Sequence, residues 1–568
     1  MAGGRASFEI QIFHNGHWVT EEFRETELTA RAQAKVLLQK PDAQGIRIVK
    51  NWTRADGVVT ANTLYTEMRE PTAPVVNIVA IDEAPFCRET EDYYRLESRI
   101  TINRLFRKYV DQVFLTPTEL IHNYKALKKI QEADTLFPAA VDRVATIQAR
   151  ETGEDPRGRR DIIYRCVAQI TAKARRADEY PNLPKLTGND FGKLCARLET
   201  MVPPGDGDFY ALVVLSRDLV QHRNWLGKLE RLAGLAQPGQ QQPAMALLDG
   251  VFADLFGVAS ALQDVLGYQR NLAEALCAII DLYEGRFVAE RSDAKEQIAA
   301  ITPLIAGGRL EETRKSLMDR IIRQLSSAQP LSRNDPSHER EAFRAVALRL
   351  FRPEGLIGGS ETAEALTRRF VYLQDEGGKA GLRRAVPGVT TLVANQTFSV
   401  VYLLQLAASP LGAELSQDVI ATLWQVLGGN TIDTLMAPGT PIRDKLSRVT
   451  GLYHKISDAE ALPEAERQRL LTHLDTVLCG YVKREGIIEK LDDPKASLRN
   501  RATRLIEFCA SNLLPMKSKT HALARERVVA LLKQPNFEVH FTDGIADPTR
   551  CEDSLRAFYA LLARAGFK

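Results

Sequence analysis

Two histidines, His14 and His17, flank the dipeptide Asn15-Gly16 near the start of a 568-residue chain. Asn-Gly favours a two-residue type I′ turn, so the Cβ atoms of the two histidines are expected roughly 5 Å apart. Two imidazoles at this distance could hold a metal ion, but zinc sites need three or four protein ligands. Residues 10–20 contain no other His, Cys, Asp or Glu. We therefore predict no metal site and interpret His14 and His17 as residues that flank a turn.

Other residues with catalytic potential lack the spacing that their chemistry needs. The glycines of 355–360 are not followed by the lysine of a phosphate-binding loop, and His222 lacks the neighbours typical of a phosphotransfer histidine. The acidic residues around Asp543-Gly544 do not follow the alternating pattern of a calcium loop. We find no nucleophile elbow, metalloprotease helix or Cys-x-x-Cys motif. The sequence thus predicts no cofactor and favours a protein that is not an enzyme.

The strongest local charge imbalance lies in residues 495–533, where nine basic residues face only Glu507 and Glu526. Because the whole chain has a net charge of only +3, the rest of it is slightly acidic. A basic helix face can bind phosphates, anionic lipid or an acidic partner. A solvated face balanced by acidic helices is the more common alternative. The candidate anion or nucleic-acid contacts are Arg499, Arg501, Arg504, Lys517, Lys519, Arg525 and Arg527.

The first 70 residues have the pattern of a small α+β module. Strand-like alternation covers 8–14, 17–23, 45–52 and 58–68, and apolar residues at helical spacing cover 27–39. The predicted order is ββαββ, a four-stranded sheet with one face covered by a single helix.

A two-residue turn after His14 also fixes which side chains of the first hairpin lie opposite each other. Ile12 should face Val19, and Phe8 should face Phe23, on the side that packs on the helix. Phe13 and Trp18 should then form a pair on the opposite, uncovered face. Two large aromatic side chains on such a face predict a partner-binding surface. The alternative is that they pack on the helical body or shield the sheet.

The remaining chain has helical patterns separated by Gly- and Pro-containing breaks, with no fixed repeat length. We predict a mainly α fold: a large multi-helix body, either an irregular bundle or a degenerate helical-pair array, preceded by the ββαββ module. A capping box, Thr116-Pro117-Thr118-Glu119, predicts a helix start. Long continuous helices are expected at 89–115, 207–235, 244–284 and 463–490. The predicted domains are the module (1–70), a linker (71–88) and helical subdomains at 89–236, 244–333 and 337–568, the last carrying the basic segment 495–533.

Residues 385–413 contain no charged residue, which raises the question of a membrane span. Pro387-Gly388 and Ser409-Pro410 bracket only about 20 residues, and Asn395, Gln396 and Gln405 would be costly to bury in lipid. We predict a helix buried by protein, beginning after Pro387. Asp249, Asp254 and Asp264 argue against a span in the apolar segment 244–283. The seven scattered cysteines favour a reducing compartment, and the N-terminus lacks the apolar region of a secretory signal, so we expect a cytoplasmic protein.

The sequence favours a non-catalytic cytosolic interaction or regulatory protein, similar in role to a scaffold or adaptor, with the N-terminal module as a docking or sensing unit. Its expected partner is another protein. A second hypothesis is a nucleic-acid or anionic-surface binder that uses residues 495–533. A third is an enzyme whose site is assembled from distant helices.

Overall fold

The structure is a computed structural model. It describes residues 5–14, 17–38, 45–53, 59–68, 78–133, 135–237, 239–289, 293–333, 336–374, 377–429, 431–436 and 439–567. The predicted turn at Asn15-Gly16 lies outside these residues, as do residues 71–77 of the predicted linker.

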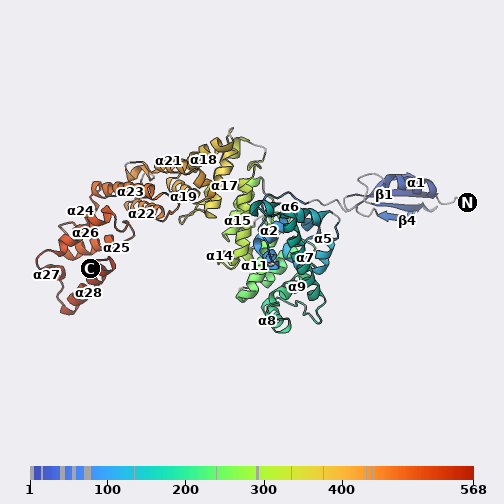
Figure 1. The fold of residues 1–568 in the computed structure, drawn as a ribbon, viewed down its shortest axis with the longest axis horizontal. Helices are drawn as coiled ribbons and strands as arrows, with labels where there is room; N and C mark the ends of the chain where they lie inside the picture. The colour runs from blue at the N-terminus through green and yellow to red at the C-terminus, as the bar shows by residue number, and fades with distance from the viewer. Residues whose placement is uncertain are drawn as a thin grey trace.

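The N-terminal module has the predicted ββαββ order (Figure 1). Its elements are β1 (Arg5–His14), β2 (His17–Arg24), α1 (Glu27–Leu38), β3 (Gly45–Thr53) and β4 (Val59–Met68). The strands form one antiparallel sheet in the order β2-β1-β3-β4. Its core is built from the module's own residues: Phe8, Ile10, Ile12, Ile46 and Ile48 of the sheet pack with Ala30, Ala34 and Leu37 of α1. One face of the sheet is thus covered by α1.

The register of the first hairpin is confirmed near the turn and wrong farther from it. Ile12 pairs with Val19 and Phe13 pairs with Trp18, as predicted. A bulge in β2 then shifts the register between Ile10 and Gln11, so Phe23 pairs with Glu9 instead of Phe8. A bulge places one extra residue in one strand, and the side chains beyond it change faces. Phe23 is consequently 59% exposed instead of buried in the module's core.

The rest of the chain is helical, as predicted. The first group of helices is η1 (Thr90–Tyr94), α2 (Leu96–Leu105), α3 (Arg107–Val113), α4 (Pro117–His122), α5 (Tyr124–Gln131), α6 (Leu136–Thr152), α7 (Pro156–Asp178), α8 (Phe191–Met201), α9 (Gly207–Leu219) and α10 (Trp225–Leu235). It is followed by α11 (Gln242–Gly257), α12 (Ala259–Leu266), α13 (Leu272–Tyr283), α14 (Lys295–Ala306) and α15 (Glu311–Ser326).

The C-terminal helices continue the same pattern. They are η2 (Pro336–His338), α16 (Glu339–Leu350), α17 (Gly359–Val371), α18 (Gly378–Val393), α19 (Gln396–Ala407), α20 (Pro410–Glu414), α21 (Ser416–Leu427), η3 (Ile432–Thr434), α22 (Ile442–Ser457), α23 (Glu464–Arg484), α24 (Ile487–Leu491), α25 (Leu498–Ala510), α26 (Lys519–Leu532), α27 (Phe537–Thr542) and α28 (Pro548–Arg564). Figure 1 shows α2 to α15 gathered into one cluster, from which α17 to α28 extend as a succession of packed helices.

The long helices expected from the sequence are divided into shorter ones, and at two of the breaks, before α10 and α13, an asparagine N-cap opens the next helix. The predicted helix 207–235 ends at Leu219 and restarts at Trp225, where Asn224 is the N-cap and its side chain accepts a hydrogen bond from Gly227 N at 2.6 Å. The predicted helices 89–115, 244–284 and 463–490 are divided as well. An N-cap side chain satisfies an amide that the new helix leaves open, so a break costs little when Asn, Ser, Thr or Asp is present. The capping box at Thr116 and Glu119 is confirmed.

The uncharged stretch forms helices that are packed by protein. Val400, Tyr402, Leu403 and Leu406 of α19 are fully buried. The expectation that the apolar helix begins after Pro387 was wrong, because Pro387 lies inside α18. Within the described residues, no single helix has the length and apolar character of a membrane span, although the pair α11 and α12, bent by 90°, meets both conditions together.

Candidate functional site

The uncovered face of the sheet brings Phe13 and Trp18 together, as their predicted pairing requires. Their ring centroids are 5.0 Å apart, with ring planes tilted by 55°. The guanidinium carbon of Arg47, on β3, lies 4.6 Å from the centroid of the Trp18 ring. Arg47 also donates from Nε to the side-chain oxygen of Gln11. Phe13 and Trp18 are each half-buried, so this aromatic pair is held in place and still reaches solvent.

A polar network beside the aromatic pair fixes the rest of this face. Glu9 accepts hydrogen bonds from the Thr20 hydroxyl, from Gln11 Nε2 at 2.6 Å and from Asn51 Nδ2 at 2.9 Å. These hydrogen bonds, that of Thr20 foremost, and the charge of Arg47 hold the pKa of Glu9 below its usual value. The face therefore presents an ordered polar surface with an aromatic patch at one end.

Phe23 is the residue of this face that the sequence did not identify. Its pairing with Glu9 places it on the uncovered side, where it is exposed. The bulge that moves it there has no glycine or proline to mark it in residues 18–24. We define Phe13, Trp18, Phe23 and Arg47 as the aromatic face.

Much of the predicted basic site is engaged inside the protein. Arg499 donates to the carbonyl oxygens of Phe541 and Asp543, at 2.9 and 3.0 Å. Arg501 and Arg527 both pair with the buried carboxylate of Asp492.

Arg525 is engaged as well, because it donates to the carbonyls of Ala565 and Gly566 and lies over the Phe567 ring. The remaining three predicted contacts, Arg504, Lys517 and Lys519, are exposed. Four of the seven cations therefore tie the C-terminal helices together, and three are left facing solvent.

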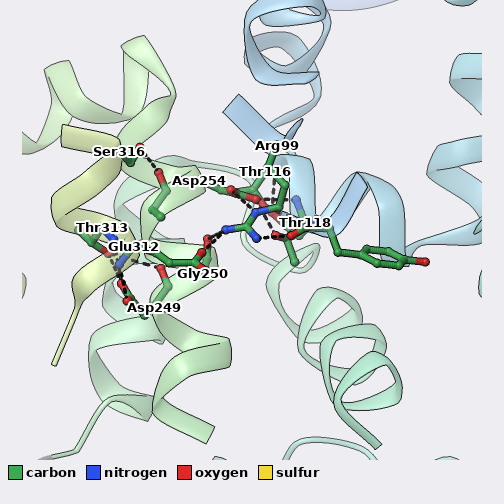
Figure 2. Close-up of polar contacts among 12 residues, drawn as sticks. Arg99, Thr116, Thr118, Asp249, Gly250, Asp254, Glu312, Thr313 and Ser316 are labelled. Carbon is green, nitrogen blue, oxygen red and sulfur yellow. Dashed lines mark hydrogen bonds and ion pairs between the residues drawn. The ribbon is translucent and has the colours of Figure 1, made fainter. Parts of the chain in front are cut away.

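The helical body also contains a buried polar cluster, drawn in Figure 2, whose residue types could do chemistry. Arg99 on α2 donates from Nε to Asp254 Oδ1 at 2.8 Å and pairs with Glu312 on its other side. Asp254 Oδ2 accepts from the amide and the hydroxyl of Thr118, at 2.7 and 2.6 Å. The cluster thus joins α2, α4, α11 and α15. Its carboxylate and guanidinium groups are occupied by protein partners, so we assign it to holding helices together.

A second carboxylate on α11 caps another helix. Asp249 accepts from the amides of Glu312 and Thr313, at 2.8 and 2.9 Å, and from the Thr313 hydroxyl at 2.7 Å (Figure 2). Asp475 on α23 makes the same set of contacts with the first turn of α26: the amides of Lys519 and Thr520, at 2.7 and 3.1 Å, and the Thr520 hydroxyl at 2.7 Å.

His122 at the end of α4 is a buried titratable group whose effect can be measured. Its Nδ1 lies 2.8 Å from the carbonyl oxygen of Thr118, and its ring packs on Tyr94 and Phe209. Burial lowers its pKa from 6.5 to about 4, and the charges of Arg99 and Lys173 act in the same direction.

We expect His122 to make the protein less stable as the pH falls from about 6.5 to about 4. In this window the unfolded chain binds a proton that the folded state excludes, which favours unfolding by up to roughly 3 kcal/mol. Urea unfolding of the wild type and of His122→Gln across this pH range measures the effect. Because the carboxylates titrate in both proteins, the difference between the two curves isolates the histidine. Parallel curves would contradict the prediction.

One cavity gathers residue types found in catalytic sites. It has a volume of about 710 Å³ and is lined by Cys277, Asp281, His338 and Glu341, among others. However, burial raises the pKa of the Cys277 thiol to about 11, whereas a nucleophilic cysteine needs a lowered pKa. The thiolate form of Cys277 is therefore disfavoured.

Among the described residues, no group of three or more His, Cys, Asp or Glu side chains is arranged to hold a metal ion. The predicted Cα pairing of His14 with His17 is present. Comparison of the chain with protein-family models, curated proteins and solved structures gave no match.

Proposed function

We propose that this protein is a non-catalytic interaction protein of the cytoplasm, in which the aromatic face of the N-terminal module docks a partner protein and the helical body provides the scaffold. The observation that carries the proposal is the pair of Phe13 and Trp18, held by Arg47 on the uncovered face of the sheet. Aromatic residues and arginine are the residue types most often found at the energetic centre of protein interfaces.

The chemistry of the face indicates what it would bind. Phe13, Trp18 and Phe23 offer apolar contact area, and Arg47 beside Trp18 supplies a positive charge. A matching partner presents an apolar side chain with a carboxylate next to it. The basic segment is less well supported as the main binding surface, because Arg499, Arg501, Arg525 and Arg527 have internal partners.

The experiment first identifies the partner and then measures its affinity. A photoreactive phenylalanine analogue at position 13 of the full chain should crosslink to a protein in the native host. We expect the double variant Phe13→Ala/Trp18→Ala to weaken binding of that purified protein by roughly thirty-fold or more, since truncating a central aromatic commonly costs 2 kcal/mol or more. Isothermal titration calorimetry measures the affinity of the partner for the wild type and for the double variant.

Leu28→Ala is the matched control, because Leu28 is 83% exposed on α1, the element that covers the opposite face. It should leave the affinity unchanged. Thermal unfolding of the variants checks that the module still folds. Equal affinity of the double variant and the wild type would refute the docking role, and crosslinking to nucleic acid instead of protein would refute the class of partner.

A further inference from the structure

A cavity at the junction of α3, α12, α13 and α15 is lined by basic and polar side chains. Its volume is about 610 Å³, within the range of small-molecule sites. Four arginines line it, with four glutamines and one asparagine, and the lining residues that the structure describes include no carboxylate. The arginines are Arg107, Arg270, Arg320 and Arg333. A cavity whose charged groups are all cationic favours an anionic ligand.

Three of the four arginines have no carboxylate within hydrogen-bond distance among the residues that the structure describes. Arg270 pairs with Glu274 at 2.8 Å and is neutralised. Arg320 donates to the carbonyl oxygen of Gly257 at 3.1 Å. Arg107 and Arg333 are exposed, and their guanidinium groups have no partner in the part of the chain that the structure describes. The cavity thus keeps the charge of Arg107, Arg320 and Arg333.

The wall of the cavity formed by α15 carries two buried polar atoms without a hydrogen-bond partner among the described residues: Nε of Arg320 and Oε1 of Gln324. The two residues are one turn apart on α15, so their side chains lie on the same face. Buried polar atoms are normally paired, because leaving one unpaired costs free energy. Arg320 Nε therefore marks a place where an acceptor of a ligand, such as a phosphate oxygen, would be stabilised, and Gln324 Oε1 marks a place for a ligand donor, such as a hydroxyl or amino group.

The charges around Arg320 also favour an anionic ligand. Burial, followed by the neighbouring charges of Arg323 and Arg107, lowers the pKa of Arg320 to about 10, against the opposing carboxylates of Asp319 and Asp111. Asp319 is already paired with Arg323, and Asp111 accepts the hydroxyl of Ser260 at 2.7 Å. An added anion would reduce the repulsion between these guanidinium groups.

Part of the cavity lining is apolar, and we call this part the apolar wall. It is formed by buried side chains of α12 and α13, including Leu262, Leu266 and Ile279, beside the polar Gln263 of α12. Tyr268, between these two helices, is 66% exposed and lines the same cavity. An apolar wall with an exposed aromatic ring suits the planar part of a ligand, since aromatic rings stack on one another.

We propose that this cavity binds a small organic phosphate of nucleotide size, with its phosphate oxygens held by Arg107, Arg320 and Arg333 and its planar ring placed against Tyr268 and the apolar wall. Arginine is suited to this role because its planar guanidinium group donates two parallel hydrogen bonds to phosphate. This inference is independent of the docking role of the N-terminal module.

The test is calorimetric titration of the full chain with pyrophosphate, adenosine, the four common ribonucleoside diphosphates and a short single-stranded oligonucleotide. At least one diphosphate should bind saturably and roughly ten times more tightly than pyrophosphate, and adenosine should not bind. Tyr268→Ala should weaken binding of that diphosphate and leave pyrophosphate unchanged.

Arg107→Gln and Arg333→Gln should each lower the affinity for that diphosphate by roughly ten-fold or more, which is the usual effect of losing a charge-assisted hydrogen bond. These exposed residues are preferred to Arg320, whose bond to Gly257 also serves the fold. Arg448→Gln, an exposed arginine on α22, is the control and should bind as the wild type does.

The proposal is overturned if no nucleoside diphosphate binds, or if both arginine variants bind as tightly as the wild type. Equal affinity for pyrophosphate and the diphosphates would overturn the assignment of the planar group. Tighter binding of the oligonucleotide than of any diphosphate would identify the surface as a nucleic-acid site instead.

Discussion

Replacing Lys228 with methionine should lower the free energy of unfolding by roughly 3–5 kcal/mol, because it leaves the carboxylate of Glu119 buried without its counter-charge. Lys228 on α10 and Glu119 on α4 form an ion pair in which the side chains are 1% and 0% exposed. Burial lowers the pKa of Lys228, and the charge of Glu119 opposes that shift. Glu119 is thus the carboxylate that offsets the cost of burying the ammonium group.

The second variant of this experiment replaces both charges. Glu119→Gln/Lys228→Met keeps an oxygen that can accept the Thr116 amide, which Glu119 binds at 2.9 Å, and removes the unpaired charge. It should regain more than half of the lost stability, because a neutral pair of similar volume avoids the cost of burying ions. Urea unfolding of the single and double variants measures this. A double variant as unstable as Lys228→Met would show that packing, and not charge, causes the loss.

Asp254→Ala should cost a similar amount, roughly 3–5 kcal/mol, for a different reason. This carboxylate is the shared acceptor of Arg99 and of the first turn of α4, through the amide and hydroxyl of Thr118. Its removal leaves three buried donors without that acceptor, and each unsatisfied group carries a desolvation cost. Thermal and urea unfolding of the purified variant give the change.

Glu312→Gln is the control for this prediction, since Glu312 contacts the same Arg99 from the other side. The Glu312 side chain is 39% exposed, so water can replace what it loses. We expect a loss of about 1 kcal/mol or less. If Glu312→Gln were as destabilising as Asp254→Ala, the burial of the Asp254 carboxylate would not explain the loss of stability.

The parts of the fold that could be predicted are those decided by neighbouring residues. The Asn15-Gly16 dipeptide predicted the pairing of Phe13 with Trp18, and the capping box predicted the start of α4 at Pro117; both are present. Period-2 and period-3.6 patterns separated the module from the helical body. Each of these signals acts within a few residues, which is why a single sequence carries it.

The parts that could not be predicted depend on residues far apart in the chain. The bulge that exposes Phe23 is the exception: it lies between neighbouring strands, but no glycine or proline in residues 18–24 marks it. Lys228 and Glu119 lie in separate predicted helices, and nothing in either segment indicates the other. The arginine-lined cavity brings Arg107 of α3 together with Arg320 and Arg333, which lie on and just after α15, far along the chain. In contrast, residues 495–533 look like one basic surface in sequence, whereas the fold uses most of the arginines among them as internal links.

The aspartates that cap neighbouring helices affect the direction in which those helices pack. An apolar stripe buries equally well against a helix running in either direction, so hydrophobic packing alone leaves the reversed arrangement competitive. Asp249 and Asp475 remove this ambiguity, because a carboxylate finds free amides only at the amino end of a helix and would meet carbonyl oxygens at the other. Asp249 therefore sets the direction in which α15 packs on α11, and Asp475 sets the direction in which α26 packs on α23. The hydrogen bond from the threonine hydroxyl to each aspartate also fixes the position of the first turn along the neighbouring helix.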